Sequence, residues 1–289
     1  MRATRLGLIS LLVVLLSSPA LGQASRTVTR TAALSPTGTV SLRSYAGRVD
    51  VRTTDADSVR VAVRIEGPDT ASVNRTAIEF TTSDERFDIE TSYDALEDER
   101  SFFGLFSWGS GDRPATDYSL TIPRSASLRV ETYSAATTVA DLSGSLRFDA
   151  YSASLTADRI GGRLEADTYS GDVEVARAES GLTMNTYSGH LRADSLSGPV
   201  AFSSYSGGAR IGFSAVTDDG RLESYSGTVT VTLPPQAGAV IETTSSALDA
   251  EVPARTERLD EDRVRATVGD GGPTLRFDTY GGRITVRRP

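Results

Sequence analysis

Residues 168–175 read Thr-Tyr-Ser-Gly-Asp-Val-Glu-Val, and this stretch decides the fold because it recurs along the chain. The tyrosines that mark its copies lie eighteen residues apart at Tyr133, Tyr151, Tyr169, Tyr187 and Tyr205. Tyr225 follows after twenty residues, and Tyr280 marks a further copy that reads Thr-Tyr-Gly-Gly. Self-similarity at one short period is typical of a repeat architecture in which each unit stacks on the next.

One repeat, residues 164–181, alternates apolar and polar residues on both sides of its Tyr-Ser-Gly segment. Alternation with a period of two is the pattern of a β-strand. Each half of the repeat ends in Ser-Gly or Gly-Gly, residue pairs that accept tight turns. We therefore predict two short strands and two corners in each repeat.

Aligning the repeats places apolar residues in columns. The inward columns are Leu146, Leu164, Leu182, Val200; Phe148, Ala166, Met184, Phe202; Leu155, Val173, Leu191, Ala209; and Ala157, Val175, Ala193, Ile211. The pattern predicts an all-β fold, a parallel β-solenoid whose coils hold about 18 residues and two strands and rise by about 4.8 Å per coil. A stack of antiparallel hairpins is the alternative, because corners this short also form hairpins.

The tyrosine breaks the alternation, because Thr168 keeps the inward parity of its strand whereas Tyr169 has the parity of Val173. A bulge or a sharp corner after Tyr169 must absorb the shift. We expect each ring to pack on the rings above and below it, with its hydroxyl in water. The simpler interpretation is a structural ladder, and the functional alternative is a strip that binds sugar rings or peptides. The candidate strip residues are Tyr151, Tyr169, Tyr187 and Tyr205.

The chain divides into three predicted parts. Residues 1–24 have the charged start, the apolar run and the small residues of a secretory signal peptide. Residues 25–126 are predicted to form a β-rich N-terminal cap, because terminal repeats are usually atypical. Residues 127–289 are predicted to form the β-strand repeat solenoid, with residues 274–287 as its last coil and residues 255–265 as a charged loop or edge strand.

The apolar run of the signal is too short for an ordinary membrane span, although an uncleaved N-terminal anchor is the alternative. We expect an exported protein, periplasmic or extracellular at the cell surface, with no transmembrane span in the mature chain. The 38 acidic and 30 basic side chains leave a formal net charge of −8, which disfavours nucleic acid and anionic lipid as partners. The absence of cysteine excludes disulfides, thiolate metal sites and a cysteine nucleophile.

Residues 94–113 interrupt the strands with an aromatic insertion. Its large apolar side chains are Phe102, Phe103, Phe106 and Trp108. One interpretation is a loop that covers a sheet face or the open end of the stack. The other is an exposed apolar tip that contacts a partner or a membrane, since large exposed apolar patches usually mark interaction.

Few residues suggest chemistry. His190, the only histidine, is expected to be a solvated corner residue rather than part of a Ser-His-Asp triad. Asp149 and Asp167 share a column, where stacked carboxylates could bind a hard cation or act as an acid/base pair. Solvated surface charge is the simpler interpretation, so we expect no catalytic residue, no metal and no cofactor.

The repeated Tyr-Ser-Gly-Asp-Val corner at 169–173, with related copies at 187 and 225, follows a strand that ends in Ile122-Pro123-Arg124. Here the chain resembles the bacterial DUF4097-type "putative adhesin" family of β-strand repeat proteins, from about Val40 to the C-terminus. The resemblance implies an envelope-associated β-solenoid without enzyme activity. We therefore expect a non-enzymatic scaffold or binding module for an envelope protein or a polysaccharide. The alternative is a carbohydrate-active β-helix enzyme or a polysaccharide-binding protein.

Overall fold

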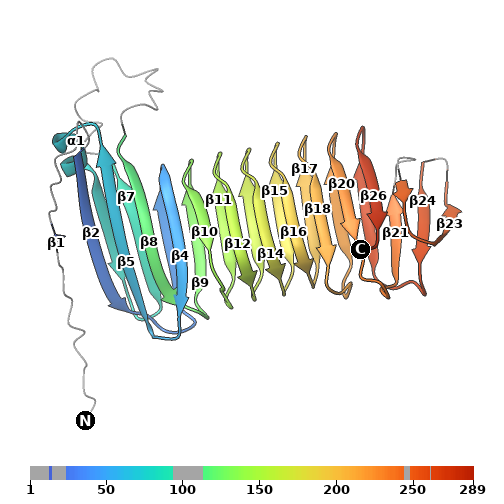
Figure 1. Ribbon diagram of the computed structural model, residues 1–289, viewed down its shortest axis with the longest axis horizontal. Helices are drawn as coiled ribbons and strands as arrows, with labels where there is room; N and C mark the ends of the chain where they lie inside the picture. Colours follow the sequence, from blue (N-terminus) through green and yellow to red (C-terminus); the bar gives the residue numbers. More distant parts are fainter. Residues whose placement is uncertain (1–12, 15–23, 94–112, 244–247, 261) are drawn as a thin grey trace, which may run out of the picture. The chain divides into compact units, whose positions relative to one another are not determined.

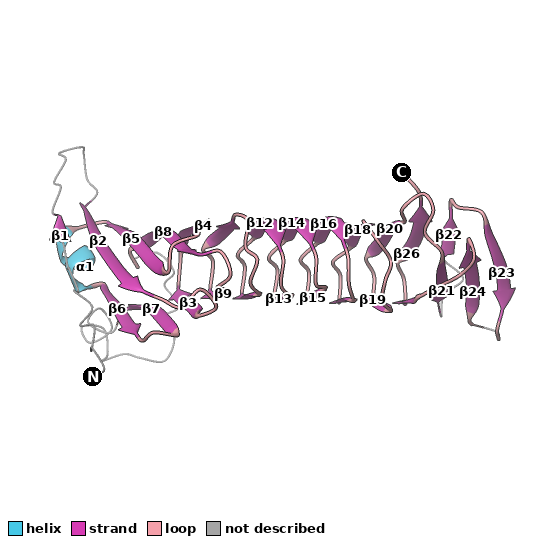
Figure 2. Cartoon of the chain, turned by 90° about the horizontal axis from the view of Figure 1, so that it is seen from below, coloured by secondary structure: helices cyan, strands magenta, loops and turns pink. Residues whose placement is uncertain are grey.

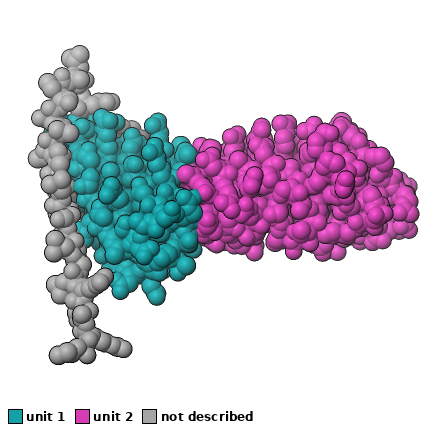
Figure 3. All heavy atoms as spheres, turned by 60° about the horizontal axis from the view of Figure 1, so that its bottom comes forward, with its two compact units in different colours: residues 1–138 teal, residues 139–289 magenta. Residues whose placement is uncertain are grey.

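The computed structural model describes residues 13–14, 24–93, 113–243, 248–260 and 262–289 (Figure 1). The chain divides into two compact units, residues 1–138 and 139–289, which Figure 3 colours separately. Regular structure in the described ranges is nearly all β-strand, arranged in sheets dominated by parallel pairing, which confirms the all-β prediction.

The first unit holds strands from two sheets. They are β1 (Val13–Val14), β2 (Ala24–Ala33), β3 (Thr39–Ser44), β4 (Gly47–Thr54), β5 (Ser58–Gly67), β6 (Ala77–Thr82), β7 (Arg86–Ser92), β8 (Ala115–Pro123) and β9 (Ser127–Thr132), while β10 (Ala136–Val139) crosses the boundary. One sheet runs in the order β1-β2-β5-β8-β4 and the other in the order β9-β3-β7-β6. The first unit contains antiparallel pairs such as β2 with β5 as well as parallel pairs such as β3 with β9, so its strands do not repeat regularly.

The helix α1 (Thr70–Arg75) follows β5. Asp69 caps it, because its carboxylate accepts a hydrogen bond of 2.7 Å from the backbone N–H of Ser72. That hydrogen bond is the main reason why the pKa of Asp69 lies below its ordinary value. Among the described residues, no helix is long and apolar enough to cross a membrane.

The second unit consists of two facing rows of strands joined by short corners (Figure 2). One row holds β12 (Leu155–Ile160), β14 (Val173–Ala178), β16 (Leu191–Leu196), β18 (Ala209–Phe213), β20 (Thr228–Thr232), β26 (Arg283–Arg287) and β22 (Leu248–Ala250). The other holds β11 (Leu146–Ala150), β13 (Leu164–Thr168), β15 (Leu182–Thr186), β17 (Val200–Ser204), β19 (Gly220–Ser224), β25 (Thr274–Thr279), β21 (Ala239–Thr243), β24 (Val264–Val268) and β23 (Ala254–Arg258).

Parallel pairing between equivalent strands confirms the coil. Leu164 lies opposite Leu146 on one side and opposite Leu182 on the other, so residues one repeat apart are direct neighbours. The second row keeps the same register, with Val173 between Leu155 and Leu191. A stack of antiparallel hairpins would have reversed these pairings, and the structure rules it out for these strands.

The core lies between the two rows and consists of the expected columns. Phe148, Ala166, Met184 and Phe202 follow one another in register, and each is no more than 1% exposed. The large ring of Phe148 is followed by the small methyl group of Ala166 in the next coil, as close packing favours. Burial of these side chains is the main term that stabilises the coil.

The C-terminal coil does not occupy the end of the stack. Strand β25 pairs in parallel with β19 on one side and with β21 on the other, and β26 likewise lies between β20 and β22. The last coil in sequence is therefore inserted between two coils that precede it in the chain. Residues 234–238 carry the chain from β20 past the inserted coil to β21, and β24 and β23 then extend the sheet as an antiparallel pair.

Glu242 on β21 links the inserted coil to its neighbours. Its carboxylate accepts hydrogen bonds from Arg265 of β24 at 2.7 Å and from Arg276 of β25 at 3.3 Å. The Glu242 side chain is only 14% exposed. The hydrogen bond from Arg265, followed by that from Arg276, lowers the pKa of Glu242 below its ordinary value of 4.5 against the opposing effect of desolvation.

Deleting residues 273–289 should destabilise the second unit severely. The deletion removes four side chains that are no more than 1% exposed: Leu275, Phe277, Ile284 and Val286. Because each contributes about 1.5–3 kcal/mol of burial, we expect the melting temperature in circular dichroism to fall by more than about 10 °C. Deleting Pro289 alone is the control and should leave it unchanged. A truncated chain that melts like the intact one would contradict the insertion.

The stability of the folded protein should depend on pH through Glu242. A carboxylate whose pKa is lowered by folding stabilises the protein fully above its unfolded pKa of about 4.5, and that contribution is lost as the pH falls through the lowered value. Glu242→Gln should therefore have a lower melting temperature than the wild type at pH 7, and this difference in melting temperature should shrink at pH 3. The exposed Glu251→Gln serves as the control. A gap of the same size at both pH values would argue against this role.

Candidate functional site at the tyrosine corner

Each Tyr-Ser-Gly segment forms the corner at which the chain passes from one row of strands to the other. Strand β13 ends at Thr168 and β14 begins at Val173, so the corner occupies residues 169–172. The change of parity after Tyr169 is absorbed by this corner, one of the two possibilities expected from the sequence. Backbone groups of neighbouring corners bond to each other, as when the N–H of Tyr187 donates to the carbonyl of Tyr169 at 3.1 Å.

A hydroxyl group three residues before each corner glycine fixes the turn. The N–H of Gly189 donates to Thr186 Oγ1 at 2.8 Å, and the N–H of Gly207 donates to Ser204 Oγ at 2.7 Å. Ser224, only 2% exposed, accepts from the N–H of Gly227 and donates to the carbonyl of Gly207, both at 2.8 Å. Sequence reasoning missed this role, although the Ser or Thr directly before Tyr187, Tyr205 and Tyr225 was its visible signal.

The corner glycines are required by contact with the coil beneath them. A Cβ on Gly189 would lie 2.1 Å from the carbonyl oxygen of Gly171, and one on Gly207 would lie 1.8 Å from that of Gly189. No side chain can occupy such a position without moving the backbone. Glycine therefore fits the close approach of these corners.

This close approach stacks the tyrosine rings face to face. In the second unit the ladder comprises Tyr151, Tyr169, Tyr187, Tyr205, Tyr225 and Tyr280. Neighbouring ring centroids are 4.9 or 5.0 Å apart, and the interplanar angles lie between 2° and 8°. The spacing matches the distance between hydrogen-bonded strands, about 4.8 Å. The structure thus brings the four candidate strip residues into one continuous column.

Stacking decides which part of each ring a partner can reach. The first five side chains of the ladder are 45–50% exposed, whereas Tyr280 is 83% exposed. Because the rings between Tyr151 and Tyr280 cover one another's faces, they present their edges and hydroxyl groups to solvent. Binding of sugar rings or peptides by the strip remains a prediction, and it would use edges and hydroxyls rather than ring faces.

A second aromatic group lies in the first unit. The rings of Tyr45 and Tyr133 are stacked at 4.9 Å and 6°, and Tyr93 meets Tyr45 edge-on at 6.2 Å. The guanidinium carbon of Arg113 lies 4.6 Å from the centroid of the Tyr45 ring, within the range of a cation–π contact. Burial raises the pKa of Tyr93, whose hydroxyl donates to the carbonyl of Pro114 at 3.0 Å.

The aromatic insertion lies outside the described residues apart from Arg113. Phe102, Phe103, Phe106 and Trp108, the expected partner-binding residues, belong to the range 94–112. The predicted signal peptide, residues 1–24, also lies outside the described ranges except for Val13, Val14 and Ala24. Both predictions stay as stated.

The stacked carboxylates are tied together by one arginine. Arg147 contacts Asp149 at 3.0 Å, and Glu165 and Asp167 each at 3.2 Å. Asn185 donates to the second oxygen of Asp167 at 2.8 Å. The hydrogen bond to Asp149 is the main cause of a raised pKa at Arg147. Within the described ranges, no group of three or more His, Asp or Glu side chains is arranged to hold a metal ion.

His190 lies at a corner beside Asp172 of the adjacent coil. The carboxylate of Asp172 accepts from the backbone N–H of His190 at 2.8 Å and lies 3.3 Å from its ring nitrogen Nδ1. Both side chains are more than half exposed. The pair stabilises the approach of two corners, and its exposure is that of a solvated surface contact.

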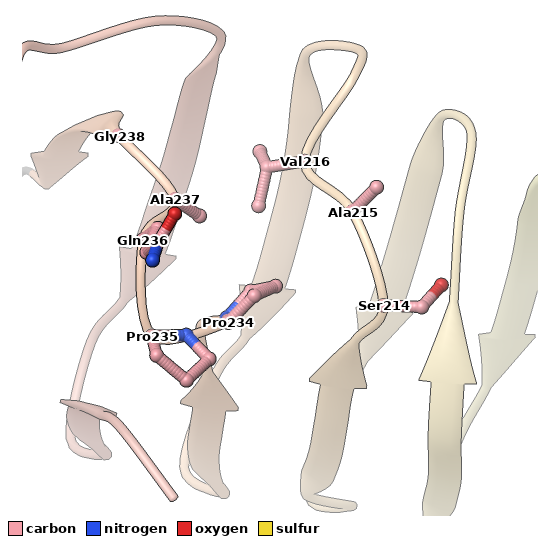
Figure 4. Close-up of a pocket in the computed structure, with 8 residues that line it drawn as sticks. All are labelled: Ser214, Ala215, Val216, Pro234, Pro235, Gln236, Ala237 and Gly238. Carbon is pink, nitrogen blue, oxygen red and sulfur yellow. The ribbon is translucent and has the colours of Figure 1, made fainter.

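An apolar pocket of about 550 Å³ lies where the chain passes the inserted coil (Figure 4). Residues 214–216 form one side of it and residues 234–238 the other. Arg288 donates to the carbonyl of Ala237 at 3.3 Å and so holds the second segment in place. The pocket lining consists mainly of alanine, valine and proline, without a pair of charged groups that could activate a substrate.

Two adjacent glycines test the corner geometry. A Cβ on Gly282 would lie 2.0 Å from the carbonyl oxygen of Gly227, whereas one on Gly281 would lie 3.9 Å from its nearest neighbour. Gly282→Ala should lower the free energy of unfolding by about 1–3 kcal/mol, as expected of overpacking, and Gly281→Ala should change it by less than about 0.5 kcal/mol. Urea denaturation measures both. Equal effects would show that corner contact does not limit stability.

Comparison with known proteins finds only distant similarity outside the family models. No curated protein matches the chain. A "putative adhesin" from Bacteroides fragilis NCTC 9343 is 12% identical, covers 91% of this chain and 97% of its own, and has a TM-score of 0.45. A "putative lipid binding protein" from Parabacteroides distasonis ATCC 8503 is 12% identical, covers 90% and 96%, and has a TM-score of 0.35. Similarity this low carries no argument about function.

A family model identifies the protein family of this chain. The model described as Toastrack DUF4097 matches residues 40–287. This range includes the corners at Tyr169 and Tyr187 and the inserted coil with Tyr280, and it confirms the resemblance seen in the repeated corner. This chain therefore belongs to the Toastrack DUF4097 family.

Proposed function

We propose that this chain is an exported, non-enzymatic scaffold of the bacterial cell envelope that binds another envelope component, a protein or a polysaccharide. The observation that carries the proposal is the tyrosine ladder, six exposed side chains in register at 4.9 or 5.0 Å. Tyrosine combines an apolar body with a polar hydroxyl and is enriched where proteins meet their partners.

The ladder suits an extended partner because it is rigid and repetitive. The rings are held by stacked neighbours, and the corners at Gly189, Gly207, Gly227 and Gly282 by the hydroxyl–glycine hydrogen bond. Little conformational entropy would be lost when a partner binds such a surface. A linear polymer or an extended protein segment could repeat the same contact from coil to coil.

The charged face supports a binding role over catalysis. A glycosidase needs two carboxyl groups that are free to exchange protons with the substrate. Asp149 and Asp167 instead share the guanidinium of Arg147, which also holds Glu165. The four groups form one ion-pair network on the outer side of the sheet.

Export is supported by the N-terminal pattern. Arg2 and Arg5 precede an apolar run, which is followed by small residues around Gly22 and Ala24. The absence of cysteine is compatible with the periplasm and with the cell surface, because a chain without thiols cannot form disulfides in an oxidising environment. Periplasmic or cell-surface location is thus part of the proposal.

Expression of the full chain in a bacterial host tests the proposal. We expect mass spectrometry of the exported fraction to find a chain cleaved after Gly22 or Ala24 that cosediments with purified envelope fragments. The triple variant Tyr169→Phe/Tyr187→Phe/Tyr205→Phe keeps the stacked rings and removes three hydroxyls. It should cosediment at least about tenfold more weakly, since each lost hydrogen bond costs about 1 kcal/mol.

Thr156→Val, an exposed substitution on β12 away from the corner, is the matched control and should bind like the wild type. Retention in the cytoplasm, or cosedimentation unaffected by the triple variant, would count against the proposal. Release of reducing sugar from envelope polysaccharide that disappears in Arg147→Gln would instead favour the carbohydrate-active enzyme.

A further inference from the structure

Tyr280 differs from the rest of the ladder in offering a ring face. One face of its ring lies on Tyr225, with centroids 5.0 Å apart and an angle of 7°. Its exposure of 83%, against 47% for Tyr225, shows that no described residue covers the other face. Neighbouring rings at 4.9 or 5.0 Å are already in contact, so no ligand can enter between them.

In the first unit, by contrast, the ring face of Tyr45 is covered by another side chain. There the ring of Tyr45 lies against Tyr133 on one side, and Arg113 covers it at 4.6 Å from the centroid. Tyr45 is thereby engaged by a side chain of the same unit, whereas Tyr280 remains the most exposed aromatic residue in the described ranges. An uncovered, rigid aromatic face is a surface on which a ligand can stack.

A polar cavity of about 490 Å³ adjoins the Tyr280 corner. Gly281 and Gly282, which directly follow Tyr280, form part of its lining. The remaining polar lining comes from the neighbouring coils and from β26: Ser226, Thr228, Asp249 and Arg283. Insertion of the C-terminal coil between β20 and β22 brings these groups together.

The cavity contains hydrogen-bonding groups without net charge. Asp249 and Arg283 lie 4.0 Å apart and are each at least half exposed, so their charges offset each other while their remaining donors and acceptors stay accessible. Ser226 and Thr228 add two hydroxyl groups that can donate or accept. A cationic ligand would gain no net attraction here, because Arg283 opposes the field of Asp249.

We propose that Tyr280 and the cavity beside it form a binding site for one pyranose ring of an uncharged oligosaccharide. This inference rests on the proposed scaffold role and names a ligand class for it. A pyranose ring has a face of C–H groups that packs on the electron-rich face of an aromatic ring. Its rim of hydroxyl groups needs donors and acceptors, which Asp249, Arg283 and the two hydroxyl residues supply.

The stack behind Tyr280 prepares the site. Tyr225 supports the inner face of the ring, and the backbone N–H groups of Tyr280 and Gly281 donate to the carbonyl of Tyr225 at 3.2 and 2.8 Å. The ring is therefore held in place before a ligand arrives, which reduces the entropy lost on binding.

Isothermal titration calorimetry of the mature protein with two probes tests the site. The probes are the uncharged β-linked hexasaccharides of glucose and of N-acetylglucosamine. We expect at least one to bind the wild type, and Tyr280→Ala to weaken that binding about tenfold, equivalent to about 1.4 kcal/mol. Tyr280→Phe keeps the face and should bind within about threefold of the wild type, because it loses at most one hydrogen bond.

Two further variants separate the stacking from the polar contacts. Asp249→Asn should weaken binding about threefold by changing one acceptor to a donor. Leu259→Ala removes another exposed apolar side chain of the same unit and should leave binding unchanged. Melting temperatures of all variants within about 2 °C of the wild type would show that the coil is intact.

The outcomes also distinguish this inference from the scaffold role. Envelope association without binding of either hexasaccharide would overturn the sugar site and leave the scaffold role standing. Hexasaccharide binding that Tyr280→Ala does not weaken would overturn the assignment to Tyr280. Saturation of the site by arginine ethyl ester, with the hexasaccharides excluded, would show that the open face takes a cation, and this too would overturn it.

Discussion

Each corner glycine lies against the backbone carbonyl of the corner one coil away, so closely that a Cβ would come within about 2 Å of the oxygen. This contact, repeated at Gly171, Gly189 and Gly207, lets the coils approach closely at the edge of the core. The Thr186 and Ser204 hydroxyls, which accept from the N–H groups of Gly189 and Gly207, hold these turns in one conformation. The corners, the paired strands and the core side chains then repeat at the same distance from one coil to the next.

The tyrosine ladder follows from that spacing. Rings fixed to identical corners must repeat at the distance between coils, and face-to-face contact at 4.9 or 5.0 Å is the result. The same contact removes ring faces from the surface, so a partner that meets the middle of the ladder meets edges and hydroxyls. A structural role and a binding role are therefore compatible in the same six residues, and they use different parts of each ring.

The inserted C-terminal coil completes both the core and the ladder. Phe277 continues the column of Leu222, Leu275 lies opposite Gly220, and Tyr280 continues the column of Tyr225. Glu242 joins this coil to the strands that follow it in space through Arg265 and Arg276. The end of the ladder and the polar cavity beside it thus exist because a late segment of the chain lies between two earlier ones.

The alternation of apolar and polar residues indicated the all-β class, and the eighteen-residue period gave the core columns and favoured a parallel coil, in which side chains stack at a constant offset. Strand pairing in the structure then decided against the antiparallel hairpins. It also placed Tyr151, Tyr169, Tyr187 and Tyr205 in one column before any coordinates were known. The position of the coil that contains Tyr280 could not be read from the order of the residues, because the repeat specifies which coils fit together and not which ones are adjacent in space. Only tertiary structure decided that Tyr280 stacks on Tyr225, that Asp249 meets Arg283, and that one ring face remains open, since each of these contacts joins segments that the sequence separates.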